Sequence, residues 1–234
     1  MNKTEQKEED RLGLNSKWYP QAVHTHEYHL QILIKTNIYI QHEKIYPLRK
    51  NLAYSLQYIE FLSKLNTDIY MSSVLKKQNI KSIVIHSATI IEAIFYYLVV
   101  SNGLSNTTKW AKTKSISTGE YSLLNNTMKN EIIIYEKLKE KIIAPMTFDQ
   151  ISKKVEKKKL LGKSFDHYHK ISAIRRLRNK IHIHDSDHNF DTDFNNFSNK
   201  ELVLVFDVLH SILISELFKE SDYRKNYAFL LIDS

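Results

Sequence analysis

The stretch that most constrains the fold is the apolar run at residues 79–103, NIKSIVIHSATIIEAIFYYLVVSNG. At helical spacing it is apolar on nearly every face, and it ends in a glycine suited to a helix C-cap. A helix that is apolar all round belongs in the middle of a bundle, where other helices cover it. We therefore expect a buried helix at residues 80–100, packed against residues 165–182.

Glycine and proline are scarce, with 4 Gly and 3 Pro among 234 residues. Sandwiches and barrels need many Gly/Pro turns, so this scarcity favours long helices joined by few connections. Helical periodicity is found at residues 23–65 and 121–143, and Ser198 with Glu201 forms a capping box that opens the last clear helix. The predicted fold class is all-α, a helical bundle.

The predicted organisation has one folded domain. Residues 1–22 form a flexible N-terminal segment, and residues 23–234 form a single helical domain. Residues 104–120 are polar and weakly patterned, so we expect a surface excursion from the bundle there.

Composition excludes several classes of protein. The chain has no cysteine, which removes disulfide frameworks, thiolate zinc sites and cysteine nucleophiles. No apolar run approaches the ~18–20 residues of a membrane span, and the charged N-terminus lacks a signal-peptide core. We expect a cytoplasmic protein with no membrane partner. A formal charge of +8 and a pI of 9.3 favour a polyanionic partner, with nucleic acid the first candidate.

The most unusual stretch is residues 174–188, IRRLRNKIHIHDSDH. On a helical wheel Arg178 falls in the apolar sector of Ile171, Ile174 and Ile181. An arginine on the core side needs a partner, because an unpaired buried guanidinium is very costly. Two interpretations stay open: a structural salt bridge to an acid on a neighbouring helix, or an anion site that holds a phosphate.

The order of residues at this helix end resembles a known motif. Arg178 is followed at once by Asn179, and five residues separate Arg178 from His184. This pattern resembles the signature of the HEPN superfamily, small all-α domains with an arginine, four to six residues and a histidine. His182 leaves too short a spacing for the pattern. The resemblance covers residues 25–220.

The resemblance implies a metal-independent endoribonuclease, often a toxin or an antiviral, abortive-infection effector. It implies a homodimer whose two motifs form one composite cleft, RNA as substrate, an antitoxin or regulatory protein as further partner, and no cofactor. Arg178, Asn179 and His184 would be the catalytic residues. Ser186 stands where HEPN toxins paired with nucleotidyltransferase antitoxins often carry a tyrosine, so silencing by modification at that position is doubtful.

The proposed chemistry needs these residue types. RNA carries its own nucleophile, the 2′-hydroxyl, so a histidine poised near neutral pH can take its proton or protonate the leaving oxygen. Arg178 can neutralise charge on the pentavalent phosphate. Asn179 can orient the histidine or donate to a phosphate oxygen, and His182 is a supporting residue on the face of Arg178.

Glu92 interrupts the apolar run and belongs to a polar stripe at helical spacing. Its members are Ser82, His86, Thr89, Glu92 and Tyr96. The stripe could face the cleft, with Glu92 paired to Arg178 in a supporting role. Alternatively, it is a buried hydrogen-bonded seam with no catalytic part.

A lysine-rich stretch, KKVEKKKLLGK, suggests a sequence-independent tether for RNA phosphates. The predicted RNA-binding residues are Lys153, Lys154, Lys157, Lys158 and Arg175. The alternative is a solvated helix face.

Histidines also permit a metal site. One cluster comprises His24, His26, Glu27 and His29, and the other lies at residues 182–188. Neither cluster matches a metal motif of established spacing, so no metal is expected. Two further functions stay open: a catalytically silent HEPN module that binds RNA, a nucleotide or a protein, and a metal-dependent hydrolase.

Overall fold

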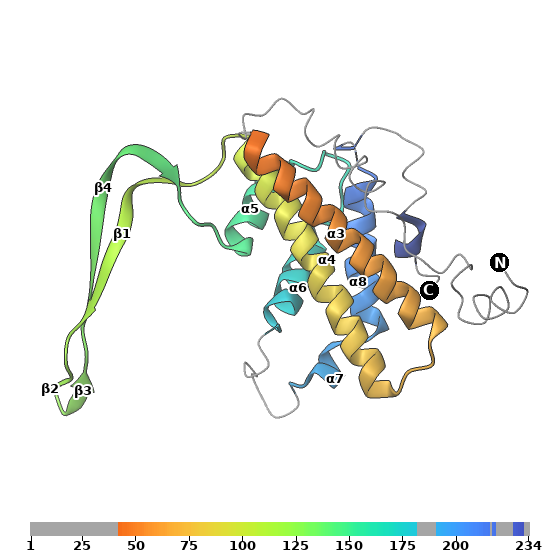
Figure 1. Ribbon diagram of the computed structural model, residues 1–234, viewed down its shortest axis with the longest axis horizontal. Coiled ribbons are helices and arrows are strands. Elements are labelled where there is room, and N and C mark those ends of the chain that lie inside the picture. Colours follow the sequence, from red (N-terminus) through yellow and green to blue (C-terminus); the bar gives the residue numbers. More distant parts are fainter. Residues whose placement is uncertain (1–41, 182–190, 216, 219–226, 232–234) are drawn as a thin grey trace, which may run out of the picture. The chain divides into compact units, whose positions relative to one another are not determined.

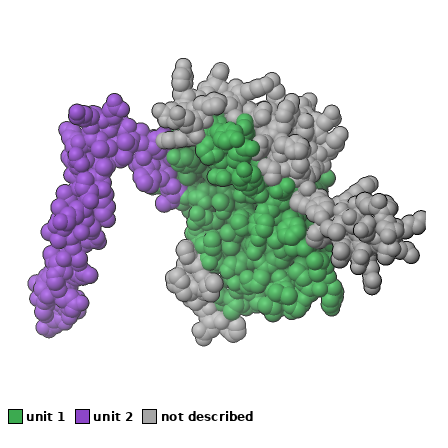
Figure 2. Space-filling model, viewed as in Figure 1, with its two compact units in different colours: residues 1–102, 148–234 green, residues 103–147 purple. Residues whose placement is uncertain are grey.

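A computed structural model describes residues 42–181, 191–215, 217–218 and 227–231 (Figure 1). The flexible segment predicted at residues 1–22, and the part of the predicted helix at 23–65 that precedes residue 42, lie outside these described residues. The chain divides into two compact units, Met1–Asn102 with Phe148–Ser234, and Gly103–Thr147 (Figure 2). We call them the helical unit and the hairpin unit.

The centre of the helical unit is helix α4 (Ser73–Ser101), the apolar run of the sequence. The other helices are α3 (His42–Asp68), α5 (Phe148–Lys158), α6 (Tyr168–Asn179), α7 (Asp193–Asn196) and α8 (Asn199–Leu213). All five contact α4, and Figure 1 shows α3 on one side of it and α5 and α6 on the other. The predicted buried helix, packed against the helix that holds Arg178, is confirmed.

The ends of two helices follow from local sequence. The Ser72 hydroxyl accepts a hydrogen bond from the Leu75 N–H at the start of α4, and Gly103 follows its end at a φ of +66°. Positive φ favours glycine, so this residue stops the helix at little cost. Ser198 and Glu201 form the predicted capping box at the start of α8. The Ser198 hydroxyl accepts a hydrogen bond from the backbone of the first turn, and the Glu201 carboxylate accepts one from the Ser198 N–H.

The hairpin unit contains strands only. Strand β1 (Thr107–Ser117) pairs antiparallel with β4 (Glu131–Ile143), and β2 (Tyr121–Leu123) pairs with β3 (Asn126–Met128). The register of β1 against β4 shifts between Thr108 and Trp110 and again between Lys112 and Lys114. Leu124 and Asn125 form the two-residue turn between β2 and β3, with φ of 53° and 63°.

These strands correct the all-α prediction, because the protein is a mixed α/β structure. Residues 121–143 were expected to be helical, and this expectation is wrong, because they form β2, β3 and β4; the polar excursion predicted at 104–120 contains strand β1. The isoleucine run at 132–134 is β-branched and favours strands. Asn125 tolerates the positive φ that a two-residue hairpin turn requires, whereas Leu124 adopts it at a cost, so strand propensity and one of the two turn residues favour a hairpin.

The expectation that no apolar run approaches a membrane span is wrong for α4, which among the described residues is long and apolar enough to cross a membrane by length and composition. Of its most apolar 18-residue window, however, 61% is buried within the protein. Such burial is typical of the core helix of a folded domain.

Candidate functional site

Helix α6 carries Arg178 near its C-terminal end, where Asn179 is the last helical residue. Ile171 and Ile174 are buried on the same helix, and Arg178 lies one turn beyond Ile174 on that side. Its side chain is 38% exposed, so it occupies the rim of the core rather than the interior. The wheel therefore predicted the side of the helix correctly but overstated the burial.

The partner of Arg178 is Glu92 on α4. An Nη2 atom of Arg178 lies 3.2 Å from Oε2 of Glu92, whose side chain is 21% exposed. The guanidinium has five N–H donors in a planar fork. A carboxylate can accept only part of that set, so the pair is compatible with a phosphate that binds the same arginine. This is the ion pair that the sequence suggested between the two helices.

Glu92 lies on the solvent-exposed side of α4, together with the rest of the polar stripe. Most residues of this part of α4 are buried, but each member of the polar stripe is partly or well exposed. The members are Ser82, His86, Thr89, Glu92 and Tyr96. The interpretation of this stripe as a buried seam is therefore wrong.

His86 is the member of the stripe that contacts α3. Its ring meets the Tyr58 ring edge to face at a centroid distance of 4.8 Å. Burial lowers the pKa of the His86 imidazole, so its neutral form is favoured near pH 7.

An ion pair joins the residues on either side of the segment 182–190. Lys180, next after α6, forms an ion pair with Asp191, whose side chain is only 5% exposed. Further along, Lys81 of α4 binds Asp193 at 2.8 Å. Burial acts to raise the pKa of Asp193, but hydrogen bonds from Lys81 and Gln78 outweigh it and hold the pKa below its usual value.

The predicted histidines at this helix end, His182 and His184, lie outside the described residues. So do the two histidine clusters at residues 24–29 and 182–188. Within the part of the chain that the structure describes, no group of three or more His, Asp or Glu side chains could hold a metal ion. The described site consists of the Arg178–Glu92 pair, Asn179 and the polar stripe.

The predicted RNA-binding residues divide into two groups. Arg175 and Lys153 both form ion pairs with Asp149, the Lys153 contact at 2.7 Å. The others lie on α5, where Lys157 and Lys158 are exposed in its last turn and Lys154 is partly exposed. Two of the five cations are therefore partly neutralised by an acid of the same chain.

Asp149 was not singled out from the sequence, although its i,i+4 spacing to Lys153 is a usual signal for an ion pair. It helps to line a pocket of about 230 Å³ between α5 and α6. The pocket also contains Ser152, Glu156, Tyr168, Ile171, Ser172 and Arg175. Its walls carry both signs of charge, so it is not a simple anion site.

Comparisons with known proteins do not assign the chain to a family. No protein-family model, no curated protein and no solved structure gives a significant match to it.

Proposed function

We propose that this chain is a metal-independent endoribonuclease of the HEPN type that acts as a toxin or an antiviral, abortive-infection effector. The observation that supports it best is the Arg178–Glu92 ion pair, 3.2 Å between charged atoms, on the accessible rim of two packed helices. Arg178 lies in the sequence shortly before the segment that holds His184. An arginine in this setting is oriented by an acid and is still reachable from solvent.

In the proposed reaction the 2′-hydroxyl of RNA attacks the adjacent phosphorus. The bond to the 5′-oxygen breaks, and the products are a 2′,3′-cyclic phosphate and a 5′-hydroxyl. His184 would transfer a proton at the attacking or the leaving oxygen. Arg178 would neutralise the charge that grows on the phosphate oxygens, while Glu92 orients its guanidinium.

The exposed lysines of α5, Lys157 and Lys158, would contact RNA phosphates without sequence preference. A homodimer would join two such motifs in one cleft, in the cytoplasm, with an antitoxin or regulatory protein as a further partner. A positive charge of +8 on the chain favours the approach of RNA.

A second function is favoured by one observation. Arg175 and Lys153 of the predicted RNA-binding set are both paired with Asp149. Basic side chains that form ion pairs with an acid of the same chain fit a catalytically silent HEPN module that binds RNA, a nucleotide or a protein partner without cutting it. The two proposals differ in whether RNA is cleaved.

The test compares His184→Ala with His182→Ala, a matched control two residues away. Loss of a positioned acid or base lowers a rate by ~10²- to 10⁴-fold, so His184→Ala should abolish cleavage of a labelled RNA while His182→Ala costs much less. Wild-type cleavage should survive excess EDTA and leave cyclic phosphate ends. Arg178→Ala should also abolish cleavage, and circular dichroism would check its folding.

Three results would refute the proposal of a metal-independent ribonuclease. A folded His184→Ala protein that cuts RNA like the wild type would remove the role of His184. Cleavage that EDTA abolishes and a divalent ion restores would favour the metal-dependent hydrolase instead. Wild-type protein that binds RNA and never cuts it would support the silent module.

A further inference from the structure

The hairpin unit leaves its apolar side chains uncovered. All of residues 103–147 are described and none is buried. The large exposed apolar side chains on β1 and β4 include Trp110, Ile116, Ile132, Ile133, Ile134 and Tyr135. A two-stranded hairpin by itself is marginally stable in water, and exposed apolar patches usually mark an interaction surface.

One edge of β4 is open for pairing. In the described part of the chain β4 pairs only with β1. The Ile134 carbonyl accepts a hydrogen bond from Thr113 Oγ1 of β1 at 3.0 Å, so the backbone of Ile134 faces β1. Because successive residues of a strand alternate in direction, the N–H and C=O groups of Ile133 and Tyr135 face the open edge. An edge of this kind is a template for another strand.

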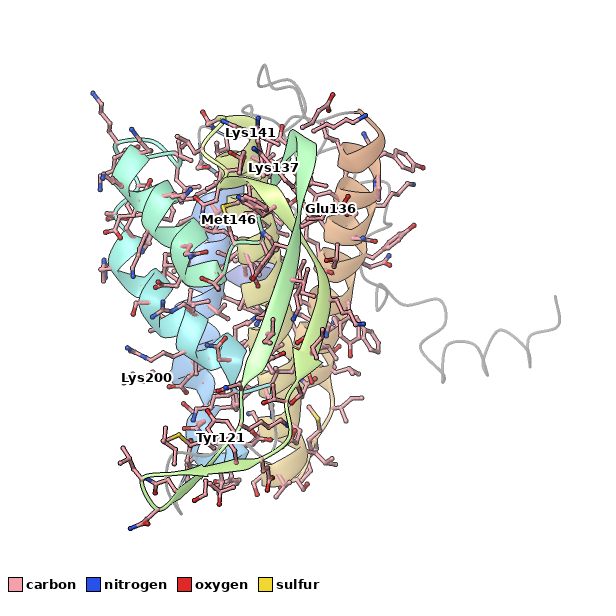
Figure 3. All side chains as sticks on the ribbon, turned by 90° about the vertical axis from the view of Figure 1, so that its left-hand side faces the viewer. Tyr121, Glu136, Lys137, Lys141, Met146 and Lys200 are labelled. Carbon is pink, nitrogen blue, oxygen red and sulfur yellow. The ribbon has the colours of Figure 1, made fainter. Side chains whose placement is uncertain are left out.

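The charges on β4 favour another copy of β4 over other occupants. The strand carries equal numbers of both signs: Glu131, Glu136, Glu140, Lys137, Lys139 and Lys141. Strand β1 has only cations, Lys109, Lys112 and Lys114. In a chain with a net charge of +8, β4 is thus a neutral edge where two copies can meet with little repulsion. Figure 3 labels three of its charged residues, Glu136, Lys137 and Lys141.

We propose that β4 pairs antiparallel with β4 of a second copy, centred on Ile134, to form a continuous four-stranded sheet. Two-fold symmetry preserves the faces of a sheet, so a central residue must lie opposite its own copy. Centring on Ile134 sets Ile133 opposite Tyr135 of the second copy, with their backbone groups already directed at the shared edge.

The same register places Glu131 opposite Lys137 of the second copy at both ends of the pairing. Opposite charges that face each other across strands stabilise a sheet. Centring on Glu136 would instead set that carboxylate against its own copy, and centring on Ile133 would set Glu131 against Tyr135. Of these three registers, only the one centred on Ile134 sets opposite charges against each other, and this holds whether or not the chain cuts RNA.

The absence of cysteine from the whole chain makes a clean cross-linking experiment possible. Ile134→Cys places one thiol at the proposed centre, where Cα atoms of a non-hydrogen-bonded pair lie ~4.5 Å apart, a separation that a disulfide spans. Ile116→Cys on β1 is the control, because Ile116 and Ile134 are 40% and 42% exposed. Mild oxidation should give a covalent dimer for Ile134→Cys and little for Ile116→Cys.

A charge exchange in the Ile134→Cys protein tests the register. Glu131→Lys should lower the rate of cross-linking by roughly 3- to 10-fold, because two lysines then face each other at both ends. Adding Lys137→Glu should restore it. Light scattering should show at least a dimer for the wild type, and Ile134→Cys combined with His184→Ala should cross-link as well as Ile134→Cys alone.

Three results would overturn the proposal. They are a wild-type protein that stays monomeric at high concentration, an Ile134→Cys protein that cross-links no faster than Ile116→Cys, and a cross-link that ignores the charge exchange. A stable dimer with no Ile134 cross-link would assign association to the helical unit. Loss of ribonuclease activity alone would leave this proposal standing.

Discussion

The helical unit and the hairpin unit both contain isoleucine-rich segments, but the isoleucines are buried in the first and exposed in the second. In α4, Ile91, Ile94 and Phe95 are fully buried. In the hairpin, the isoleucines at 132–134 are all 40% exposed or more. A helix that is apolar all round is covered by the helices around it, whereas a two-stranded ribbon has no second layer within its own unit. Apolar content alone therefore does not make a core.

The largest expected effect tests this contrast directly with one kind of substitution in each unit. Ile94→Ala should destabilise the protein by about 2–5 kcal/mol, because it leaves a cavity in a packed core. Ile132→Ala, at a side chain that is 53% exposed, should stay within about 0.5 kcal/mol. Urea denaturation followed by circular dichroism measures both. A large cost for Ile132→Ala that grows with protein concentration would show that a second copy covers the hairpin.

A smaller loss of stability is expected when a buried ion pair of the helical unit is broken. Lys81 is only 7% exposed and binds Asp193. Asp193→Asn should cost about 1–3 kcal/mol, since it removes the countercharge of a buried ammonium. Lys153→Ala, which breaks an exposed pair with Asp149, should cost less than about 1 kcal/mol. Equal costs in denaturation experiments would contradict the distinction between buried and exposed pairs.

In the hairpin unit, local backbone chemistry should matter more than burial. Leu124 has a φ of 53° and is 84% exposed. Leu124→Gly relieves the strain of a left-handed residue, worth about 1 kcal/mol, and should protect the hairpin from limited proteolysis. Asn125→Gly is the control, because asparagine already tolerates this conformation. Faster cleavage of Leu124→Gly would mean that the leucine side chain contributes contacts of its own.

The smallest effect is a pH dependence of the helical unit. Burial lowers the pKa of His86 from its usual 6.5, so below that pH the unfolded chain binds more protons than the folded one. Stability should therefore fall as the pH drops from about 6.5 toward the lowered pKa. His86→Gln should reduce the slope of the free energy of unfolding between pH 7.5 and 5.5, to which His210 contributes in the same direction because burial lowers its pKa too. An unchanged slope for His86→Gln would exclude His86 as a contributor to the pH dependence.

Part of the candidate site could be predicted from the sequence. Helical spacing placed Arg178 on the side of α6 that faces α4, and it placed Glu92 in a polar stripe on α4. Their contact follows once those helices pack. The ion pairs Asp193–Lys81 and Asp149–Arg175 were not predicted, because their members come from different elements and no spacing rule joins them.

The sequence by itself determined the features that depend on near neighbours. All-round apolarity made α4 the core helix, and the capping box of Ser198 and Glu201 started α8. Local strand propensity favours strands within residues 107–143, but only the tertiary structure decided the register of β1 against β4 and which acid binds each cation. An apolar run with several lysines satisfies helix and strand patterns alike, and pairing between distant residues is chosen by the free energy of the whole packed chain rather than by any short segment.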